Sequence, residues 1–245
     1  MPEPLHRALL HLPILTTVCA ALFSLQLFAR LRLKGGGLHL LWWGIGMVTY
    51  GIGTFTEAFT TVAGWHPLVF RCWYISGAFL GGYPLAQGSI YLLMKRRFAH
   101  ASAWTVCSFI AVASILVLLT PLDPSLAEVH RLSGKVIEWH WLRLLSIPIN
   151  LYSVTFLVGG AVVSAIRFSK EPLLRHRYVG NIFIAVGALL PGIGGSLTRA
   201  GYVEALYVTE LIGLSLIYVG YRLNTSKKIP AAARAATARP MASNT

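Results

Sequence analysis

Seven stretches of about twenty mostly apolar residues constrain this chain more than any other feature. A helix needs about 20 residues to cross the ~30 Å hydrocarbon core of a bilayer, and each stretch is long enough. The pattern therefore predicts an all-α protein, a polytopic membrane bundle of seven transmembrane helices. The expected spans are 8–29, 38–60, 68–94, 101–122, 142–166, 178–198 and 205–221.

The distribution of charge predicts how the bundle is oriented. Only 12% of the residues are charged and 56% are hydrophobic, whereas about a quarter are charged in a soluble domain. The net charge of +13 is basic enough for a nucleic-acid partner, but 15 of the 21 basic residues follow the first, third, fifth and seventh spans. Such a positive-inside bias predicts an N-terminus outside and a C-terminus in the cytoplasm. We therefore expect a bacterial inner-membrane protein whose partners are membrane lipids, and no nucleic-acid partner.

The chain is expected to contain one transmembrane domain, residues 1–223, followed by a disordered cytoplasmic tail, residues 224–245. The tail is rich in Ala, Pro, Ser, Thr and basic residues and has no apolar periodicity. An offset of 137 residues superposes Arg30 on Arg167, and Ala63-Gly64 on Ala200-Gly201. This offset is compatible with a 3+1+3 repeat of the kind found in some transporters. The alternative is that any seven similar helices align roughly.

The longest connection, residues 121–141, lies between the fourth and fifth spans. Within it, Ser125-Leu126-Ala127-Glu128 has the form of a helix capping box. It predicts a short amphipathic surface helix, or alternatively a lid over an outer pocket.

Polar or small residues recur at helical spacing in most spans, so each span has a face that is expected to turn inward. For the small residues this is ordinary helix-packing chemistry. The second span carries Tyr50, Thr54, Glu57 and Thr61; the sixth carries Asn181, Ala185, Ala188, Gly192, Gly195 and Arg199; the seventh carries Tyr207, Glu210, Tyr218 and Tyr221.

Ionisable residues within spans are costly and by default mark function. Glu57, Arg71, Arg199 and Glu210 all fall in the predicted outer half of the bilayer. His66 and Tyr74 lie at a similar depth. The predicted ligand-binding residues of an outward-facing polar pocket are therefore Glu57, His66, Arg71, Tyr74, Arg199 and Glu210. The alternative is two structural ion pairs, Glu57–Arg71 and Arg199–Glu210.

Several chemistries have no suitable residues in this pattern. All lysines lie outside the expected spans, which excludes a retinal Schiff base, and no histidine lies near mid-membrane to bind a haem. An HExxH motif is absent. The three cysteines, Cys19, Cys72 and Cys107, fall within spans and do not suggest a disulfide or a metal cluster. No catalytic residue, metal or cofactor is predicted.

The second and third expected spans carry a family resemblance. The run from Trp42-Trp43-Gly44 to Tyr50, the run Arg71–Ala78, and Leu85-Ala86-Gln87-Gly88 resemble a group of uncharacterised bacterial seven-helix membrane proteins. More distantly, they are similar to the N-terminal seven-helix sensor regions of histidine kinases. The resemblance implies a membrane-embedded sensing or binding role. The stretch after Tyr221 is too short for a kinase domain, and the outer charges favour binding of a small or lipid-like ligand, so we expect the bound state to be passed to a separate protein partner. The alternatives are a transporter of small solutes or lipids, and a lipid-modifying enzyme with Glu57 or Glu210 as a base.

Overall fold

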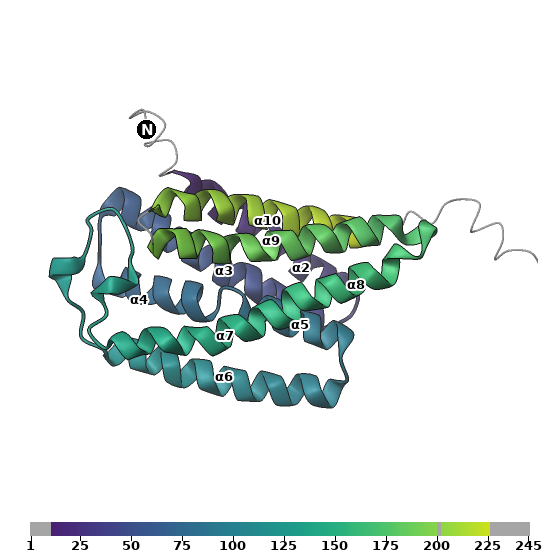
Figure 1. Cartoon of the computed structure of the whole chain (residues 1–245), viewed down its shortest axis with the longest axis horizontal. Coiled ribbons are helices and arrows are strands. Elements are labelled where there is room, and N and C mark those ends of the chain that lie inside the picture. The colour runs from purple at the N-terminus through teal and green to yellow at the C-terminus, as the bar shows by residue number, and fades with distance from the viewer. Residues whose placement is uncertain (1–10, 200–201, 226–245) are drawn as a thin grey trace, which may run out of the picture.

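The computed structural model describes residues 11–199 and 202–225, and this part of the chain is a bundle of long helices (Figure 1). The α-helices are α2 (Leu12–Leu33), α3 (Leu38–Ala63), α4 (Pro67–Trp73), α5 (Tyr83–Leu93), α6 (Arg96–Leu119), α7 (Ser146–Ser153), α8 (Gly159–Ser169), α9 (Arg175–Arg199) and α10 (Val203–Thr225). Two π-helical turns, Tyr74–Phe79 and Val154–Val158, follow α4 and α7. Because α10 extends to Thr225, it includes the first two residues of the predicted tail; the rest of that tail lies outside the described residues.

The bundle has the apolar character of a membrane protein. Five segments are long and apolar enough to cross a bilayer: Leu12–Leu33, Arg96–Leu119, His140–Ser169, Pro172–Thr198 and Glu204–Thr225. Of the expected spans, those at 38–60 and 68–94 do not meet this criterion. The helix α3 is long but rich in Gly and Thr, and the other segment is interrupted between Phe79 and Tyr83. An all-α membrane-type bundle is therefore confirmed, while the number of seven spans stays a prediction.

Apolar side chains also cover the outside of the bundle, as a lipid environment requires. Leu22 on α2, Trp104 on α6 and Val163 on α8 are 56%, 76% and 66% exposed. Soluble proteins rarely expose contiguous apolar surfaces of this kind, so the exposed positions indicate contact with acyl chains.

The bundle has two chemically different ends. The basic end contains the C-terminal turns of α2 and α10, the α5–α6 connection and the α8–α9 connection, at the right of Figure 1. The loop end contains the segment 121–145, at the left of the same view. Three short 3-10 helices, Pro124–Leu126, Gly134–Val136 and His140–Leu145, make up much of this segment.

The loop segment packs onto the bundle instead of forming the predicted amphipathic helix. Val136, Ile137 and Leu142 are at most 1% exposed and join the core formed by Phe70 and Tyr74. The predicted capping box is wrong, because a single 3-10 turn forms there. The residue that caps this turn, Asp123, accepts hydrogen bonds from the backbone N–H (2.9 Å) and the hydroxyl (2.6 Å) of Ser125. The bond from the Ser125 hydroxyl and the one from its N–H hold the pKa of the Asp123 carboxyl below its usual value.

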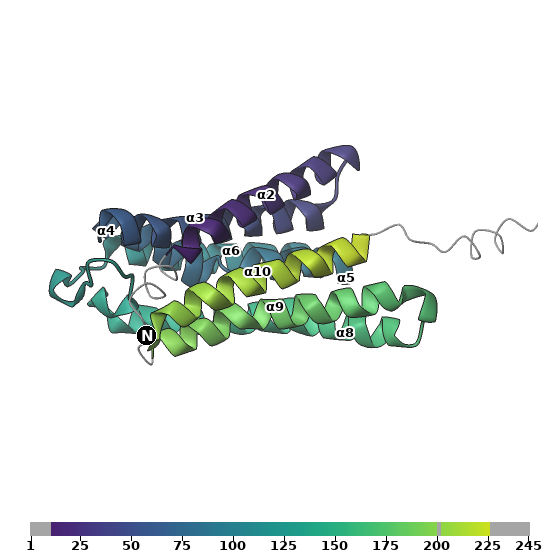
Figure 2. The same ribbon diagram turned by 90° about the horizontal axis from the view of Figure 1, so that it is seen from above.

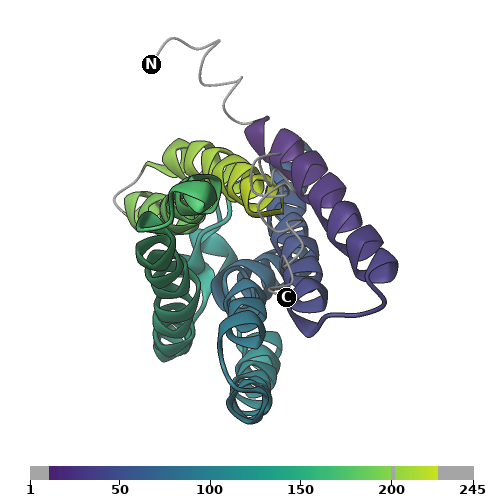
Figure 3. The same cartoon turned by 90° about the vertical axis from the view of Figure 1, so that its right-hand side faces the viewer.

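The long helices fall into two groups around the bundle axis (Figures 2 and 3). In the first group, α3 packs against α2 on one side and α4 and α5 on the other. In the second group, α9 packs against α8 on one side and α10 on the other. The helices α7 and α8 are joined by the π-helical turn Val154–Val158 into one continuous helical segment. The two groups meet where α10 contacts α2 and where α5 contacts this segment, while α6 lies against α5.

Glycines make the closest helix contact, between α9 and α10. Gly180, Gly187 and Gly194 are spaced seven residues apart on α9, and Gly213 and Gly220 face them from α10. A Cβ atom added at Gly187 would lie 2.6 Å from the carbonyl oxygen of Gly213, which no real side chain tolerates. Small residues allow helices in membranes to approach in this way.

The glycines expected to mediate packing of this span, Gly192 and Gly195, face open space instead. That detail of the predicted small-residue face is wrong, because the contact with α10 follows the row from Gly180 to Gly194. Asn181 and Ala185 of the predicted face are nevertheless buried.

A matched pair of alanine substitutions tests the glycine contact. Gly187→Ala should lower the free energy of unfolding by about 1–3 kcal/mol, because α9 and α10 must move apart to admit the methyl group. Gly192→Ala is the control, since its Cβ meets no atom within 4 Å and alanine favours helix. Unfolding of both purified variants in detergent, followed by circular dichroism, measures the difference. Equal stabilities would contradict the proposed packing of α9 on α10.

Candidate functional site

Two buried carboxyl groups face each other near the loop end. Glu57 of α3 is 3% exposed, and its Oε1 accepts a hydrogen bond of 2.8 Å from the indole N–H of Trp73. The Glu57 and Glu210 carboxyl groups lie within hydrogen-bonding reach of each other. Neither Oε2 atom receives a hydrogen bond from a protein donor, although both atoms are buried. The arrangement is an enclosed carboxyl pair that joins α3 to α10.

The polar faces of α3 and α10 converge on this pair, as their helical spacing predicts. The Tyr50 hydroxyl donates to the backbone oxygen of Glu210 at 2.9 Å. The phenol of Tyr207, which is 2% exposed, lies close enough to interact with both carboxyl groups and with Thr61. The 3.6-residue period explains why Tyr50 and Glu57 share one face of α3 and why Tyr207 and Glu210 share one face of α10.

Arg71 caps the C-terminal end of a neighbouring helix, α6. Its guanidinium donates to the backbone oxygens of Thr120 (2.8 Å) and Val117, at the C-terminal end of α6. Carbonyl groups at a helix C-terminus have no partners within the helix and carry partial negative charge, so a cation stabilises them. The alternative prediction of a Glu57–Arg71 ion pair is therefore wrong.

The remaining predicted site residues are dispersed. His66 caps the N-terminus of α4, where its Nδ1 accepts from the backbone N–H of Leu68 at 3.2 Å. Tyr74 is 6% exposed and packs in the aromatic core with Phe70 and Phe79. The side chain of Arg199 lies outside the described part of the structure, and so does the predicted Arg199–Glu210 pair. Of the six residues, the structure brings Glu57 and Glu210 together.

A cavity that the sequence analysis did not anticipate lies at the basic end. It has a volume of about 460 Å³ and lies between the two helix groups, with walls from α2, α3, α5, α8, α9 and α10. Its apolar lining includes Phe23, Leu27, Leu40, Trp43, Leu85, Leu157, Ile184 and Ile217. Its basic lining is Arg30, Lys34, Arg167 and Arg177, and none of its described lining residues is acidic.

Aromatic rings hold two of the four cations in place. The Arg30 guanidinium lies 5.5 Å from the ring centre of Tyr221 and donates to its hydroxyl at 3.3 Å. The Arg177 guanidinium lies 5.6 Å from the ring of Phe168. Stacking of this kind fixes a guanidinium while leaving most of its five N–H donors available to a ligand. Because Arg167 and Lys34 are exposed at the rim, the cavity combines an apolar interior with a cationic mouth.

A signal for this site was present in the sequence. The basic residues were interpreted only as topology determinants, yet the 137-residue offset superposes Arg30 on Arg167, and both line the cavity. The apolar lining carries no comparable signal, because it is assembled from six helices.

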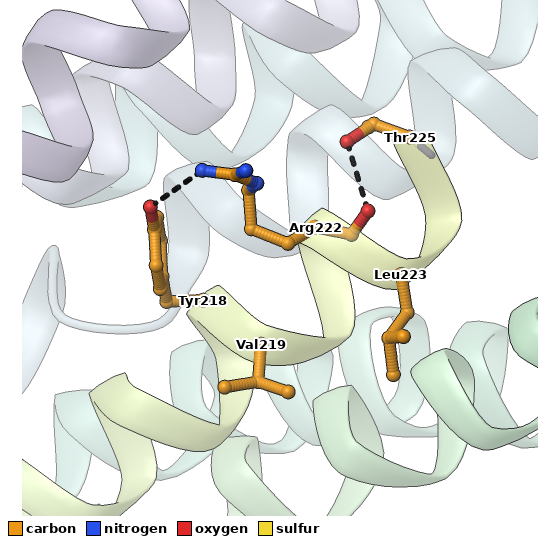
Figure 4. A pocket seen from close by; sticks show the side chains of 5 residues that line it. All are labelled: Tyr218, Val219, Arg222, Leu223 and Thr225. Atoms are coloured by element: carbon orange, nitrogen blue, oxygen red, sulfur yellow. Dashed lines mark hydrogen bonds between the residues drawn. The ribbon is translucent and has the colours of Figure 1, made fainter. Parts of the chain in front are cut away.

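A second hollow, on the flank of α10, has no opposing wall. Its lining residues, Tyr218, Val219, Arg222, Leu223 and Thr225, all belong to the last two turns of that helix (Figure 4). Arg222 donates to the Tyr218 hydroxyl at 3.0 Å, so its guanidinium is already engaged there. The single-helix lining makes this hollow a groove on the surface of α10 and not an enclosed site.

Comparisons with family models, with curated proteins and with solved structures found no significant match. The resemblance to bacterial seven-helix sensor regions therefore stays a prediction. Among the described residues, no three His, Cys, Asp or Glu side chains are grouped closely enough to hold a metal ion.

A double-mutant cycle distinguishes capping by Arg71 from pairing with Glu57. Arg71→Met should cost about 1–3 kcal/mol of unfolding free energy, because two carbonyl groups at the end of α6 lose their donors. Combined with Glu57→Gln, the two effects should add within about 0.5 kcal/mol, since the side chains share no partner. Unfolding titrations in detergent supply the four free energies. Rescue of Arg71→Met by Glu57→Gln would show that the two charges do interact.

Proposed function

We propose that this protein is an integral membrane protein that binds an amphipathic anion, a lipid-like molecule with an acidic head and an apolar chain. The observation that carries the proposal is the cavity at the basic end, with its apolar interior and four basic residues. Its volume of about 460 Å³ falls within the range of about 300–1,000 Å³ typical of small-molecule sites.

The lining matches each part of such a ligand. An acyl chain buried between Leu27 and Leu157 would contribute about 0.8 kcal/mol for each methylene group removed from water. A phosphate or carboxylate at the mouth would accept charge-assisted hydrogen bonds from Arg30 and Arg167, whose planar guanidinium groups suit bidentate contacts. The absence of acidic groups from the described lining favours an anionic ligand over a cationic one.

The topology proposed from the basic residues places this cavity on the cytoplasmic side. In a seven-span arrangement with the N-terminus outside, the basic end faces the cytoplasm. Anionic lipids in the cytoplasmic leaflet then provide ligands of the required chemistry at the mouth. A cavity that holds such a ligand suits a sensing or accessory role, in which the protein passes the ligand-bound state to a separate partner.

Reporter fusions test this orientation. A fluorescent-protein fusion after Lys170, at the basic end, should be fluorescent because this end lies in the cytoplasm. An alkaline phosphatase fusion within residues 121–141 should be enzymatically active because the loop end lies outside. The reverse pattern of activities would place the cavity mouth on the outer surface and contradict a cytoplasmic ligand.

Transport is the second candidate, and the arrangement of the helices supports it. Shifted by 137 residues, the start of α3 at Leu38 coincides with the start of α9 at Arg175, and the start of α4 at Pro67 coincides with Glu204 near the start of α10. A repeat with this register would place Arg30 and Arg167 in equivalent positions on opposite walls of one cavity. Transporters commonly bind their substrates between such repeats.

Lipid selectivity tests the binding function. After equilibration with equal amounts of phosphatidylglycerol and phosphatidylcholine of identical chains, native mass spectrometry should show one preferentially retained phosphatidylglycerol. Replacing Arg30 and Arg167 together with Gln should reduce this preference roughly tenfold, which corresponds to about 1.4 kcal/mol.

Two further variants show whether the lipid occupies the cavity. Ser164→Trp should block retention by filling the cavity while leaving all four basic residues in place. Lys95→Gln is the matched control, because Lys95 lies at the basic end but does not line the cavity. Equal losses in the arginine variant and in Lys95→Gln would attribute the preference to the surface charge of this end and contradict a cavity site.

A further inference from the structure

The enclosed carboxyl pair lies on the seam between the two helix groups. Glu57 belongs to α3 of the first group, and Glu210 belongs to α10 of the second. The two helices touch at few other points, because α10 packs mainly on α9 and α2. One of those points is the hydrogen bond from the Tyr50 hydroxyl to the Glu210 backbone oxygen. Another is the interaction of Tyr207 with Thr61. The carboxyl pair is therefore one of a small number of contacts that join α3 to α10 near the loop end.

Two adjacent buried carboxylates cannot both remain charged without compensation. Like charges at short range disfavour simultaneous ionisation, and burial strengthens their repulsion. The Trp73 indole satisfies Oε1 of Glu57, but Oε2 of Glu57 and Oε2 of Glu210 have no protein donor. An ionised carboxyl group can only accept hydrogen bonds, whereas a protonated one donates a single O–H. One proton shared between the two groups would satisfy both Oε2 atoms and remove one charge.

The groups around the pair come from each element packed against it. Tyr50 and Thr61 face it from α3, Trp73 from the end of α4, and Tyr207 from α10. Arg131 of the loop segment interacts electrostatically with Tyr207. It is already paired with Glu128 at 3.3 Å and with Glu204 at 3.1 Å.

We propose that Glu57 and Glu210 bind one proton between them and that this proton clasps α3 to α10 at the loop end. In the closed form, the carboxylic acid of one residue donates its O–H to the carboxylate of the other. When a base removes the proton, two carboxylates remain and repel each other, so the seam opens. The same two helices carry walls of the cavity at the basic end, through Trp43 of α3 and Ile217 of α10. The proton clasp does not depend on the identity of the cavity ligand.

Infrared spectroscopy of the full chain in zwitterionic nanodiscs tests for the proton. At neutral pH, wild-type protein should show the C=O stretching band of a protonated carboxylic acid, with a small shift in D₂O and a loss in alkaline buffer. The double variant Glu57→Gln/Glu210→Gln should lack this band. Glu138→Gln, which alters an exposed carboxylate of the loop end, should retain it. A wild-type spectrum without the band, or a band that persists in the double variant, would overturn the proposal.

A distance measurement tests the clasp separately from folding. Spin labels at Val62 of α3 and Ile212 of α10, both exposed, report the separation of the two helices in a cysteine-free background. In wild-type protein the separation should increase from neutral to alkaline pH. In Glu57→Gln it should stay short at both pH values, because the amide donates an N–H to Glu210 in place of the shared proton. No change in wild-type protein, or the same change in both proteins, would overturn the clasp.

Discussion

The glycine contact between α9 and α10 is the constraint on which the rest of the bundle depends. Because Gly187 and Gly213 bring the two backbones together, α10 has a fixed rotation about its own axis. That rotation directs Glu210 toward α3 near the loop end and Tyr221 into the cavity at the basic end. A bulkier residue at these glycines would displace both sites together, although neither site contains a glycine of this row.

The two ends of the seam have opposite chemistry. At the loop end, Phe70, Tyr74 and Val136 form a closed core, and the Oε2 atoms of the carboxyl pair are buried. At the basic end, α3 and α10 line an apolar cavity whose charged lining residues are cationic. The seam thus carries acidic groups at the loop end and basic groups at the other end. The basic groups support our proposal that an anionic ligand enters the cavity. The acidic groups support our proposal that a shared proton holds the loop end closed.

Features that follow from local periodicity could be predicted from the sequence. Hydropathy predicts a membrane-type helical bundle, and the spacing of Tyr50, Thr54 and Glu57 correctly predicts an inward polar face of α3. The role of Arg71 could not be predicted, because its partners lie at the end of α6 and only the packing of that helix brings them within reach. The cavity was also missed, since its six walls are distant in the sequence. Cytoplasmic orientation, seven spans and ligand binding remain predictions of the account.

A cryo-EM map of the protein in nanodiscs containing phosphatidylglycerol tests the account most directly. It should show the Glu57 and Glu210 carboxyl groups in contact, and elongated density with its head beside Arg30 and Arg167 and its chain between Leu27 and Leu157. A map in which these side chains fill the cavity themselves, with Glu57 and Glu210 paired to separate cations, would contradict both the anion site and the shared proton.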